Sequence, residues 1–250
     1  MIRLKNDSQI ALMRDAGRIT GEALCAAGEA IKPGVTTAHI DRVIRTYIEK
    51  CGARPTFLGY GEFPASACIS INDEVIHGIP SPKRVLAEGD IVKIDVGACY
   101  RGFNGDSART FPVGKISAEA ERLIRVTEES FYAALAVIRE GARVGDIGNA
   151  VDSYCRANGY SVVRRYVGHG VGAELHEDPE IPNFGTAGHG VRLIRGMTIA
   201  VEPMVNAGGH EVREMPDGWT VKTKDGSLSA HYEHSIAITD SGPELLTKVE

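Results

Sequence analysis

Apolar residues recur at helical spacing in four stretches of the chain. The predicted helices span about 7–31, 36–52, 118–139 and 145–157. Thr36 or Thr37 can cap the second helix, since a hydroxyl side chain there can accept a hydrogen bond from a free backbone N–H. One face of that helix collects the apolar residues Ile40, Val43, Ile44, Tyr47, Ile48 and Cys51. A buried helix face is therefore expected.

Two short runs between the helices have the pattern of β-strands, ACISI at 67–71 and DIVKIDVGACY at 90–100. The residues YRGF at 100–103 predict a tight hairpin turn in which Gly102 supplies a positive φ. If the first and last of these four residues pair, Asp95 has Asp106 as its diagonal neighbour on the same face. Diagonal neighbours lie about 7 Å apart. Two carboxylates at that distance point at a shared site that one or two cations could fill.

The second half of the chain repeats the first at a spacing of 107 residues. Residues 31–52 align with 138–159, and residues 85–96 align with 192–203 at the same offset. Two separate segments with one offset predict a single domain, 1–250, with an internal repeat of about 7–115 and 116–250. Solenoid repeats are shorter, about 20–50 residues. The alignment also places Asp95 on Glu202, so that each half has a carboxylate at the end of an apolar strand.

The composition is that of a globular protein: 250 residues, 43% hydrophobic and 24% charged, with a net charge of −5. Lys and Arg are scattered, so no nucleic-acid-binding motif is expected. No segment has the pattern of a signal peptide or of a membrane span, and we expect a cytoplasmic protein. The cysteines lie far apart without a C-x-x-C pair, which predicts reduced thiols: Cys25, Cys51, Cys68, Cys99 and Cys155.

Acidic residues interrupt three of the apolar runs. Asp95, Glu202 and Glu233 each lie in a β-like segment, where a buried ionised carboxylate is costly unless it is paired or binds a metal ion. A single such residue is more simply explained as part of a solvated strand face, but three of them favour a metal site. The segment GHGVGAELHEDP adds His169 among glycines, a loop-like setting in which an imidazole can reach a site.

Charge balance predicts two divalent cations. Asp95, Asp106, Glu202 and Glu233 carry four negative charges, which two such ions neutralise, and His169 adds a neutral ligand. Oxygen ligands with one nitrogen suit Co²⁺, Mn²⁺ or Fe²⁺ at least as well as Zn²⁺.

Four segments, KIDVGACYRGFNGD, GHGVGAELHEDP, AVEPMV and YEHSIA, resemble in order the metal-ligand motifs of type I methionine aminopeptidases. SACISINDEVIHGIP and DGWTVKTKDGSLSAHYEHS extend the resemblance over nearly the whole chain. It implies the α+β pita-bread fold of the creatinase/aminopeptidase class, with two pseudo-symmetric αβ halves around a central metal site. The implied activity is metal-dependent removal of the initiator methionine from nascent polypeptides whose second residue is small. The implied protein is a cytoplasmic monomer that works at the ribosome.

The resemblance also implies the role of each metal ligand. Asp95 would bind one metal ion and His169 and Glu202 the other, while Asp106 and Glu233 would bridge the two. Glu202 would also act as the base that handles the proton of the attacking water.

Substrate-binding residues follow from the same resemblance. His77 would steady the substrate and its leaving group, and His176 would donate a hydrogen bond to the scissile carbonyl. The methionine pocket would be formed by Tyr60, Phe63 and Trp219, with Phe57 and Leu175 at its wall. Three positions depart from the family pattern: Phe57 stands where Cys is common, Leu175 where Phe is common, and Gly97 where Thr is frequent. These departures bear on the shape of the pocket.

Other proteins of this fold remain alternatives. Prolidase and aminopeptidase P share the five ligands but carry an additional N-terminal domain. Type II methionine aminopeptidases have a long insertion between the last two glutamates, whereas Glu202 and Glu233 are only 31 positions apart here. Pita-bread proteins that act as binding modules have broken ligand sets, and the set here is complete.

Overall fold

The computed structural model describes residues 1–249, and its four long helices lie where the sequence predicts them. They are α1 (Asp7–Ala30), α2 (Thr37–Lys50), α3 (Ala118–Leu135) and α4 (Val144–Ala157). Thr36 caps α2, because its side chain accepts a hydrogen bond from the backbone N–H of His39. The prediction that the third helix continues to residue 139 was wrong. After Leu135 the chain tightens into i→i+3 turns, in which the N–H of Ile138 donates to Leu135.

Within residues 1–249, the strands form four small antiparallel sheets. The sheet of the first half comprises β1 (Arg54–Pro55), β2 (Ala67–Ile71), β4 (Ile91–Tyr100) and β5 (Phe103–Pro112). The largest sheet of the second half has the order β15 (Gly242–Leu245), β14 (His234–Thr239), β9 (Thr198–Val201), β7 (Gly168–Gly170), β8 (Glu177–Ile181). The two others join β13 (Ser229–His231), β10 (Met204–Asn206) and β6 (Ser161–Val162), and β11 (Val212–Glu214), β12 (Val221–Thr223) and β3 (Glu74–Ile76). A 3₁₀ turn, η1 (Tyr60–Glu62), precedes β2.

The hairpin of β4 and β5 has the predicted register. Tyr100 pairs with Phe103 and Asp95 pairs with Ala108, so that Asp106 is the diagonal neighbour of Asp95. Both central residues of the turn have positive φ, 49° at Arg101 and 85° at Gly102. The sequence indicated this conformation only for the glycine.

The spacing of 107 residues recurs in the elements themselves. Helix α4 begins and ends 107 residues after α2, and β9 begins 107 residues after β4. An isolated bridge between Thr36 and Val85 has its counterpart between Arg143 and Arg192 at the same offset. The two aligned segments therefore have similar structures as well as similar sequences.

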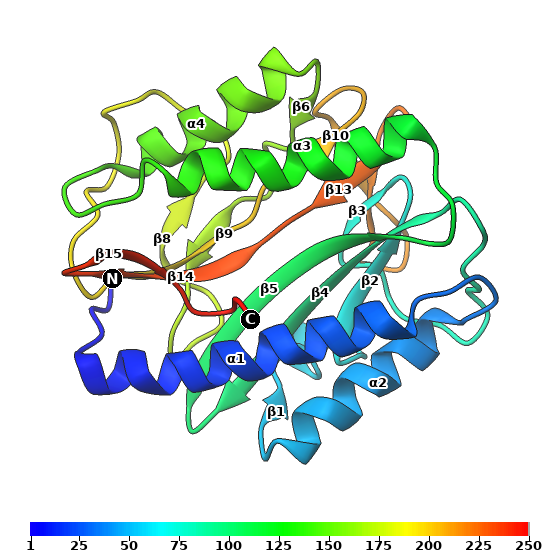
Figure 1. The fold of residues 1–250 in the computed structure, drawn as a ribbon, viewed down its shortest axis with the longest axis horizontal. Helices are drawn as coiled ribbons and strands as arrows, with labels where there is room; N and C mark the ends of the chain where they lie inside the picture. The colour runs from blue at the N-terminus through cyan, green and yellow to red at the C-terminus, as the bar shows by residue number, and fades with distance from the viewer. Residues whose placement is uncertain (250) are drawn as a thin grey trace.

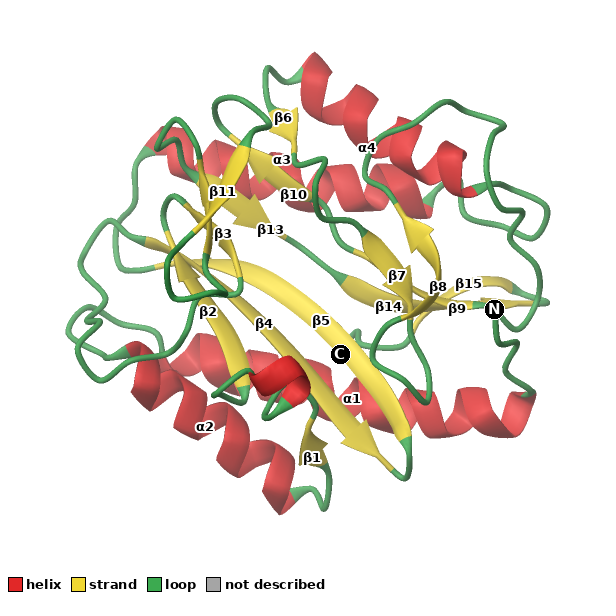
Figure 2. Ribbon diagram, turned by 180° about the vertical axis from the view of Figure 1, so that it is seen from behind, coloured by secondary structure: helices red, strands yellow, loops and turns green. Residues whose placement is uncertain are grey.

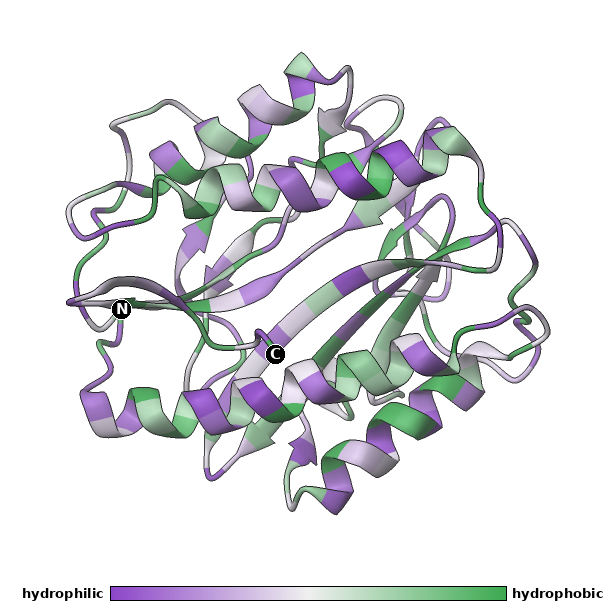
Figure 3. Ribbon diagram, in the orientation of Figure 1, coloured by the Kyte–Doolittle hydropathy of each residue, from purple (hydrophilic) through white to green (hydrophobic). Residues whose placement is uncertain are grey.

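Helices α1 and α2 lie along one side of the molecule and α3 and α4 along the other, with the strands between them (Figure 1). From behind, the strands face the viewer and the helices lie beyond them (Figure 2). Apolar and polar residues are banded along all four helices (Figure 3), as expected of helices that bury one face. Among the described residues, no helix is both long and apolar enough to cross a membrane. All five cysteines are free thiols, as predicted.

Hydroxyl side chains connect the two halves along β5. The Oγ of Ser107 donates to the carbonyl of Glu233 at 2.7 Å, and the N–H of Glu233 donates to the carbonyl of Ala108 at 2.9 Å. Ser235 accepts from the N–H of Asp106 at 3.0 Å and donates to its carbonyl at 2.9 Å. These contacts hold β5 of the first half against the 231–235 segment of the second.

Candidate metal centre and substrate pocket

A cavity of about 190 Å³ lies between the halves and is lined by every site residue that the sequence predicts. The residues predicted as metal ligands are Asp95, Asp106, His169, Glu202 and Glu233. The residues predicted to contact substrate are Phe57, Tyr60, Phe63, His77, Leu175, His176 and Trp219. Residues up to 176 positions apart in the sequence therefore share one cavity.

The four carboxylates come from two strand pairs, one in each half. Asp95 and Asp106 lie on β4 and β5, as described above. Glu202 directly follows β9 and Glu233 directly precedes β14. Because Val201 pairs with His234, continuing that register by one residue places Glu202 opposite Glu233. Each half thus contributes two carboxylates from adjacent strands.

Burial has a strong effect on these carboxylates. Desolvation and the neighbouring charge of Asp106 raise the pKa of Asp95, Glu202 and Glu233 well above the ordinary carboxyl value. Desolvation also raises the pKa of Asp106 to about 7. Within the described residues, one oxygen each of Asp95, Asp106 and Glu233 is buried without a hydrogen-bond partner. Buried, unpaired carboxylate oxygens fit divalent cations, which neutralise the charge and satisfy the free lone pairs.

His169 is oriented as a nitrogen ligand. Its Nδ1 lies 2.8 Å from the carbonyl oxygen of Gly170, which can only accept, so Nδ1 carries the hydrogen. Burial lowers its pKa to about 3, which leaves the ring neutral with a lone pair on Nε2. That nitrogen lies 3.6 Å from Asp106 Oδ2 and 3.5 Å from Glu202 Oε1. Ligand atoms of Asp106, His169 and Glu233 all lie within 4.8 Å of one another, so one ion could contact all three.

Two further histidines face the cavity. Burial lowers the pKa of His77 to about 4, and His77 has a φ of 59°, a conformation that is uncommon for a residue other than glycine. Burial also lowers the pKa of His176. The hydroxyl of Tyr60 lies 2.6 Å from Nδ1 of His176. Both rings are therefore neutral at pH 7 and positioned by their surroundings.

The remaining wall of the cavity is an apolar slot. Phe57, Phe63 and Leu175 are buried in one cluster, against which Trp219 packs. The rings of Phe63 and Trp219 meet edge to face with centroids 5.0 Å apart. Tyr60 is 44% exposed and lies at the border of the slot. A flexible apolar side chain would find aromatic contacts on several sides here.

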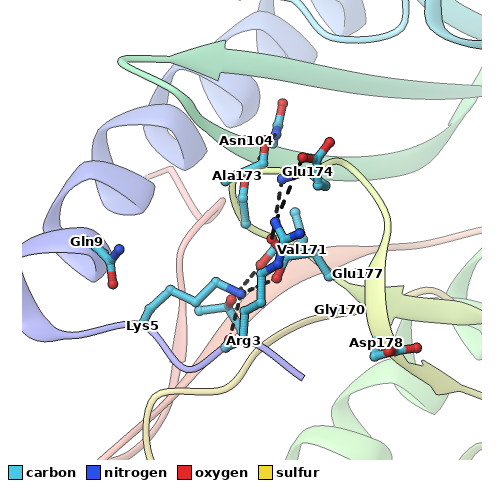
Figure 4. A network of polar contacts seen from close by, with 12 residues as sticks. Arg3, Lys5, Gln9, Asn104, Gly170, Val171, Ala173, Glu174, Glu177 and Asp178 are labelled. Carbon is cyan, nitrogen blue, oxygen red and sulfur yellow. Dashed lines mark hydrogen bonds and ion pairs between the residues drawn. The ribbon is translucent and has the colours of Figure 1, made fainter. Parts of the chain in front are cut away.

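The loop that carries Leu175 and His176 is held from two directions (Figure 4). On one side Asn104 Nδ2 donates to the carbonyls of Gly172 and Ala173 at 2.9 and 3.1 Å. On the other side Lys5 of the N-terminal segment donates to a carboxylate oxygen of Glu177, and both side chains are buried. The loop is thereby fixed between the β4–β5 hairpin and the N-terminal segment.

Sequence reasoning missed several residues of this site. Cys68, Ile76, Tyr166 and Val167 also line the cavity. Cys68 pairs with Asp95 across β2 and β4, a register that the sequence alone did not predict. His231, which the sequence left as an ordinary residue, is buried with its Nε2 3.8 Å from Glu202 Oε2 and 4.0 Å from Glu233 Oε2. Its position two residues before Glu233 was the available signal, because alternate residues of a strand share a face.

Comparisons with known proteins agree with this geometry. The model of metallopeptidase family M24 matches residues 11–240. A methionine aminopeptidase of Clostridium acetobutylicum is 54% identical over 250 residues, which is 100% of both chains. The crystal structure of a methionine aminopeptidase from Thermotoga maritima has a TM-score of 0.98 and 45% identity, and the match covers 100% of both chains. A prolidase from Pyrococcus furiosus has a TM-score of 0.77 at 24% identity, covering 99% of this chain and 66% of that one. The fold is the predicted pita-bread fold.

Proposed function

The chain belongs to metallopeptidase family M24, and from that premise we propose that it removes the initiator methionine of other proteins by hydrolysing their first peptide bond. Full-length relatives with this activity in their names support the proposal. The observation that carries it is the cavity itself, in which buried carboxylates and His169 lie beside an apolar aromatic slot. A metal-dependent hydrolase with such a slot suits a substrate with an apolar first side chain.

We propose that two divalent ions, Co²⁺, Mn²⁺ or Fe²⁺ with Zn²⁺ as the alternative, are held by Asp95, Asp106, His169, Glu202 and Glu233. When bound there, such ions act as Lewis acids toward the scissile carbonyl and lower the pKa of the attacking water. The assignment rests on the buried, unpartnered oxygens and on the free Nε2 of His169. Asp106 and Glu233 are held together by the hydroxyl contacts of β5 and are proposed as the bridging ligands.

The protein's own side chains perform the remaining steps. Glu202 accepts the proton of the attacking water, as a carboxylate within hydrogen-bond reach of that water can. The proposal assigns His176 the tautomer in which Nδ1 accepts from the hydroxyl of Tyr60, 2.6 Å away, and Nε2–H donates a hydrogen bond to the scissile carbonyl oxygen as negative charge develops there. His77 holds the leaving group in position. The slot of Phe57, Tyr60, Phe63, Leu175 and Trp219 binds the methionine side chain.

We propose a single catalytic domain, residues 1–250, composed of the repeats 7–115 and 116–250. It works as a monomer in the cytoplasm on the N-termini of nascent chains at the ribosome, where the second residue of the substrate is small.

Metal removal tests the proposal. Protein stripped of metal should not cleave Met-Ala-Ser, and Mn²⁺, Fe²⁺ or Co²⁺ should restore cleavage. Asp106→Ala should stay inactive with every ion, because two cations without their bridging carboxylate repel one another. Asp240→Ala serves as the control, since Asp240 is an exposed acid whose partner is Arg195 on the surface. Substantial cleavage by Asp106→Ala in metal-free buffer would contradict the two-metal mechanism. No cleavage by the loaded wild type would favour a binding module.

A further inference from the structure

Gly97 lies inside β4, where the backbone does not require a glycine. It pairs with Asp106 in the β4–β5 ladder and has no positive φ. A glycine within a strand weakens it, and its usual cause is a bulge or the close approach of another group. The ladder of β4 and β5 is regular at this position, which excludes a bulge. The close approach of another group is therefore the remaining explanation for the glycine.

The approaching group is the ring of Phe57. A Cβ at position 97 would lie 2.7 Å from Cε1 of Phe57 and 3.0 Å from Cβ of Thr56. Carbon atoms in favourable contact are about 3.5–4.0 Å apart, so a neighbour would have to move. Thr56 is fixed, because its N–H donates to the carbonyl of Gly97 and its Oγ1 donates to Asn104, each at 2.9 Å. The ring of Phe57, which makes the closer contact, is therefore the group that must move most.

Phe57 has one open side. It is buried against Phe63, Cys68 and Leu175, and it also lines the substrate cavity. Because the cluster is packed and the cavity is not, a ring displaced from Gly97 moves into the cavity. The missing side chain at position 97 thus determines how far the ring of Phe57 projects into the slot.

We propose that Gly97 is a specificity-determining residue, which sets the width of the slot for the substrate's first side chain by leaving room for Phe57. The inference rests on the proposed function. Gly97 does not line the cavity, and its effect on the slot is transmitted by Phe57. A difference of one methylene in an apolar pocket changes kcat/KM by about 10–200-fold, so a small displacement of the ring is enough to alter selectivity.

A double-mutant cycle tests this on the metal-loaded protein. Gly97→Ala should lower kcat/KM for Met-Ala-Ser about tenfold, mainly through KM, and should lower it less for the shorter norvaline peptide. Phe57→Leu should raise kcat/KM for the ethionine peptide, which is one methylene longer than methionine. The double variant Gly97→Ala/Phe57→Leu should return to within about threefold of wild type on Met-Ala-Ser, since the smaller side chain removes the clash.

Gly209→Ala is the matched control, because Gly209 also lacks a positive φ and its Cβ would meet only Asp225 at 3.6 Å. Metal content should be unchanged in every variant, which separates an effect on the slot from one on Asp106. The inference would be overturned if Gly97→Ala cleaved Met-Ala-Ser as well as wild type does. A defect of Gly97→Ala that persists in the double variant would overturn it as well. If Gly97→Ala does not fold, the double variant should fold, because the clash is removed. A double variant that also fails to fold would contradict the inference. A wild type that cleaves no peptide would instead count against the proposed function.

Discussion

His77 and His176 face the same cavity through different contacts. His77 is enclosed by aromatic rings, with the centroids of Tyr166 and Trp219 5.8 and 6.1 Å away. His176 touches His169, with ring centroids 4.3 Å apart, and has the hydroxyl of Tyr60 at its Nδ1. His169 uses its Nδ1 on a backbone carbonyl, so its Nε2 is free for a cation. By these contacts, His169 is suited to bind a metal ion, whereas His77 and His176 are suited to contact substrate.

Replacing either substrate-facing histidine should therefore separate chemistry from metal binding. We expect His77→Ala and His176→Ala each to lower kcat by about 10²–10³-fold, the cost of losing one positioned donor. Both variants should keep the metal content of wild type. Peptide kinetics and elemental analysis measure the two effects. His210→Ala, at an exposed position outside the cavity, is the control. Loss of metal with unchanged kcat in either variant would reverse our assignment of roles.

At the scale of elements, the long helices and the β4–β5 hairpin were predictable from the sequence, and most of the short strands were not. The face of α2 repeats over several turns, and the YRGF turn fixes the register of a ten-residue strand pair. Strands β7 and β10 have three residues each, too few to show an alternating pattern. Their conformation depends on neighbours distant in the sequence, as when β7 pairs with β8 and β9.

Helix α4 packs on α3 and carries a buried thiol, Cys155, whose ionisation should make the stability of the protein depend on pH in the alkaline range. Burial raises the pKa of Cys155 from 9.0 to about 12. The folded state therefore favours the protonated thiol, and the stability that it contributes is present below pH 9 and is lost as the pH rises toward 12. Each pH unit in this window corresponds to about 1.4 kcal/mol per titrating group.

Cys155→Ala should therefore be less stable than wild type by about 1 kcal/mol at pH 7, because it loses buried volume. The difference should shrink above pH 9 and then reverse, since alanine cannot ionise. Denaturant unfolding measured from pH 7 to 11 checks this. Ile147→Val, a buried position on the same helix, should show a difference that stays constant with pH. A constant difference for Cys155→Ala as well would show that the thiol does not titrate in this way.

For the whole molecule, the sequence predicts that two similar halves share a site, but it does not show how they are joined. The offset of 107 aligns Asp95 with Glu202, which predicts one carboxylate from each half. It says nothing of the bonds from Ser107 and Ser235 that bring Asp106 and Glu233 together. Nor does it reveal Lys5, whose contact with Glu177 ties the N-terminus to the loop of His176. Serine and lysine carry no pattern that distinguishes such contacts from surface ones.

We expect the N-terminal segment itself to be a poor substrate for the proposed activity. The ammonium group of Met1 pairs with Asp178, and Ile2 is partly buried against the core of the second half. The first peptide bond must leave this position before it can enter the cavity of another molecule. Beyond that, Ile2 is larger than any of the small second residues that the proposed function accepts.

We therefore predict that Met-Ala-Ser is cleaved and Met-Ile-Ser is not, and that a chain translated from Met1 keeps its methionine. A larger side chain next to the scissile bond displaces the carbonyl, and a displacement of about 1 Å can lower the rate about a hundredfold. Ile2→Ala should remove this obstacle, so that variant should lose Met1. Peptide assays and intact-mass measurement distinguish these outcomes. Equal cleavage of the two peptides would show that the site holds the second residue less closely than the proposed function requires, because isoleucine would then fit as well as alanine.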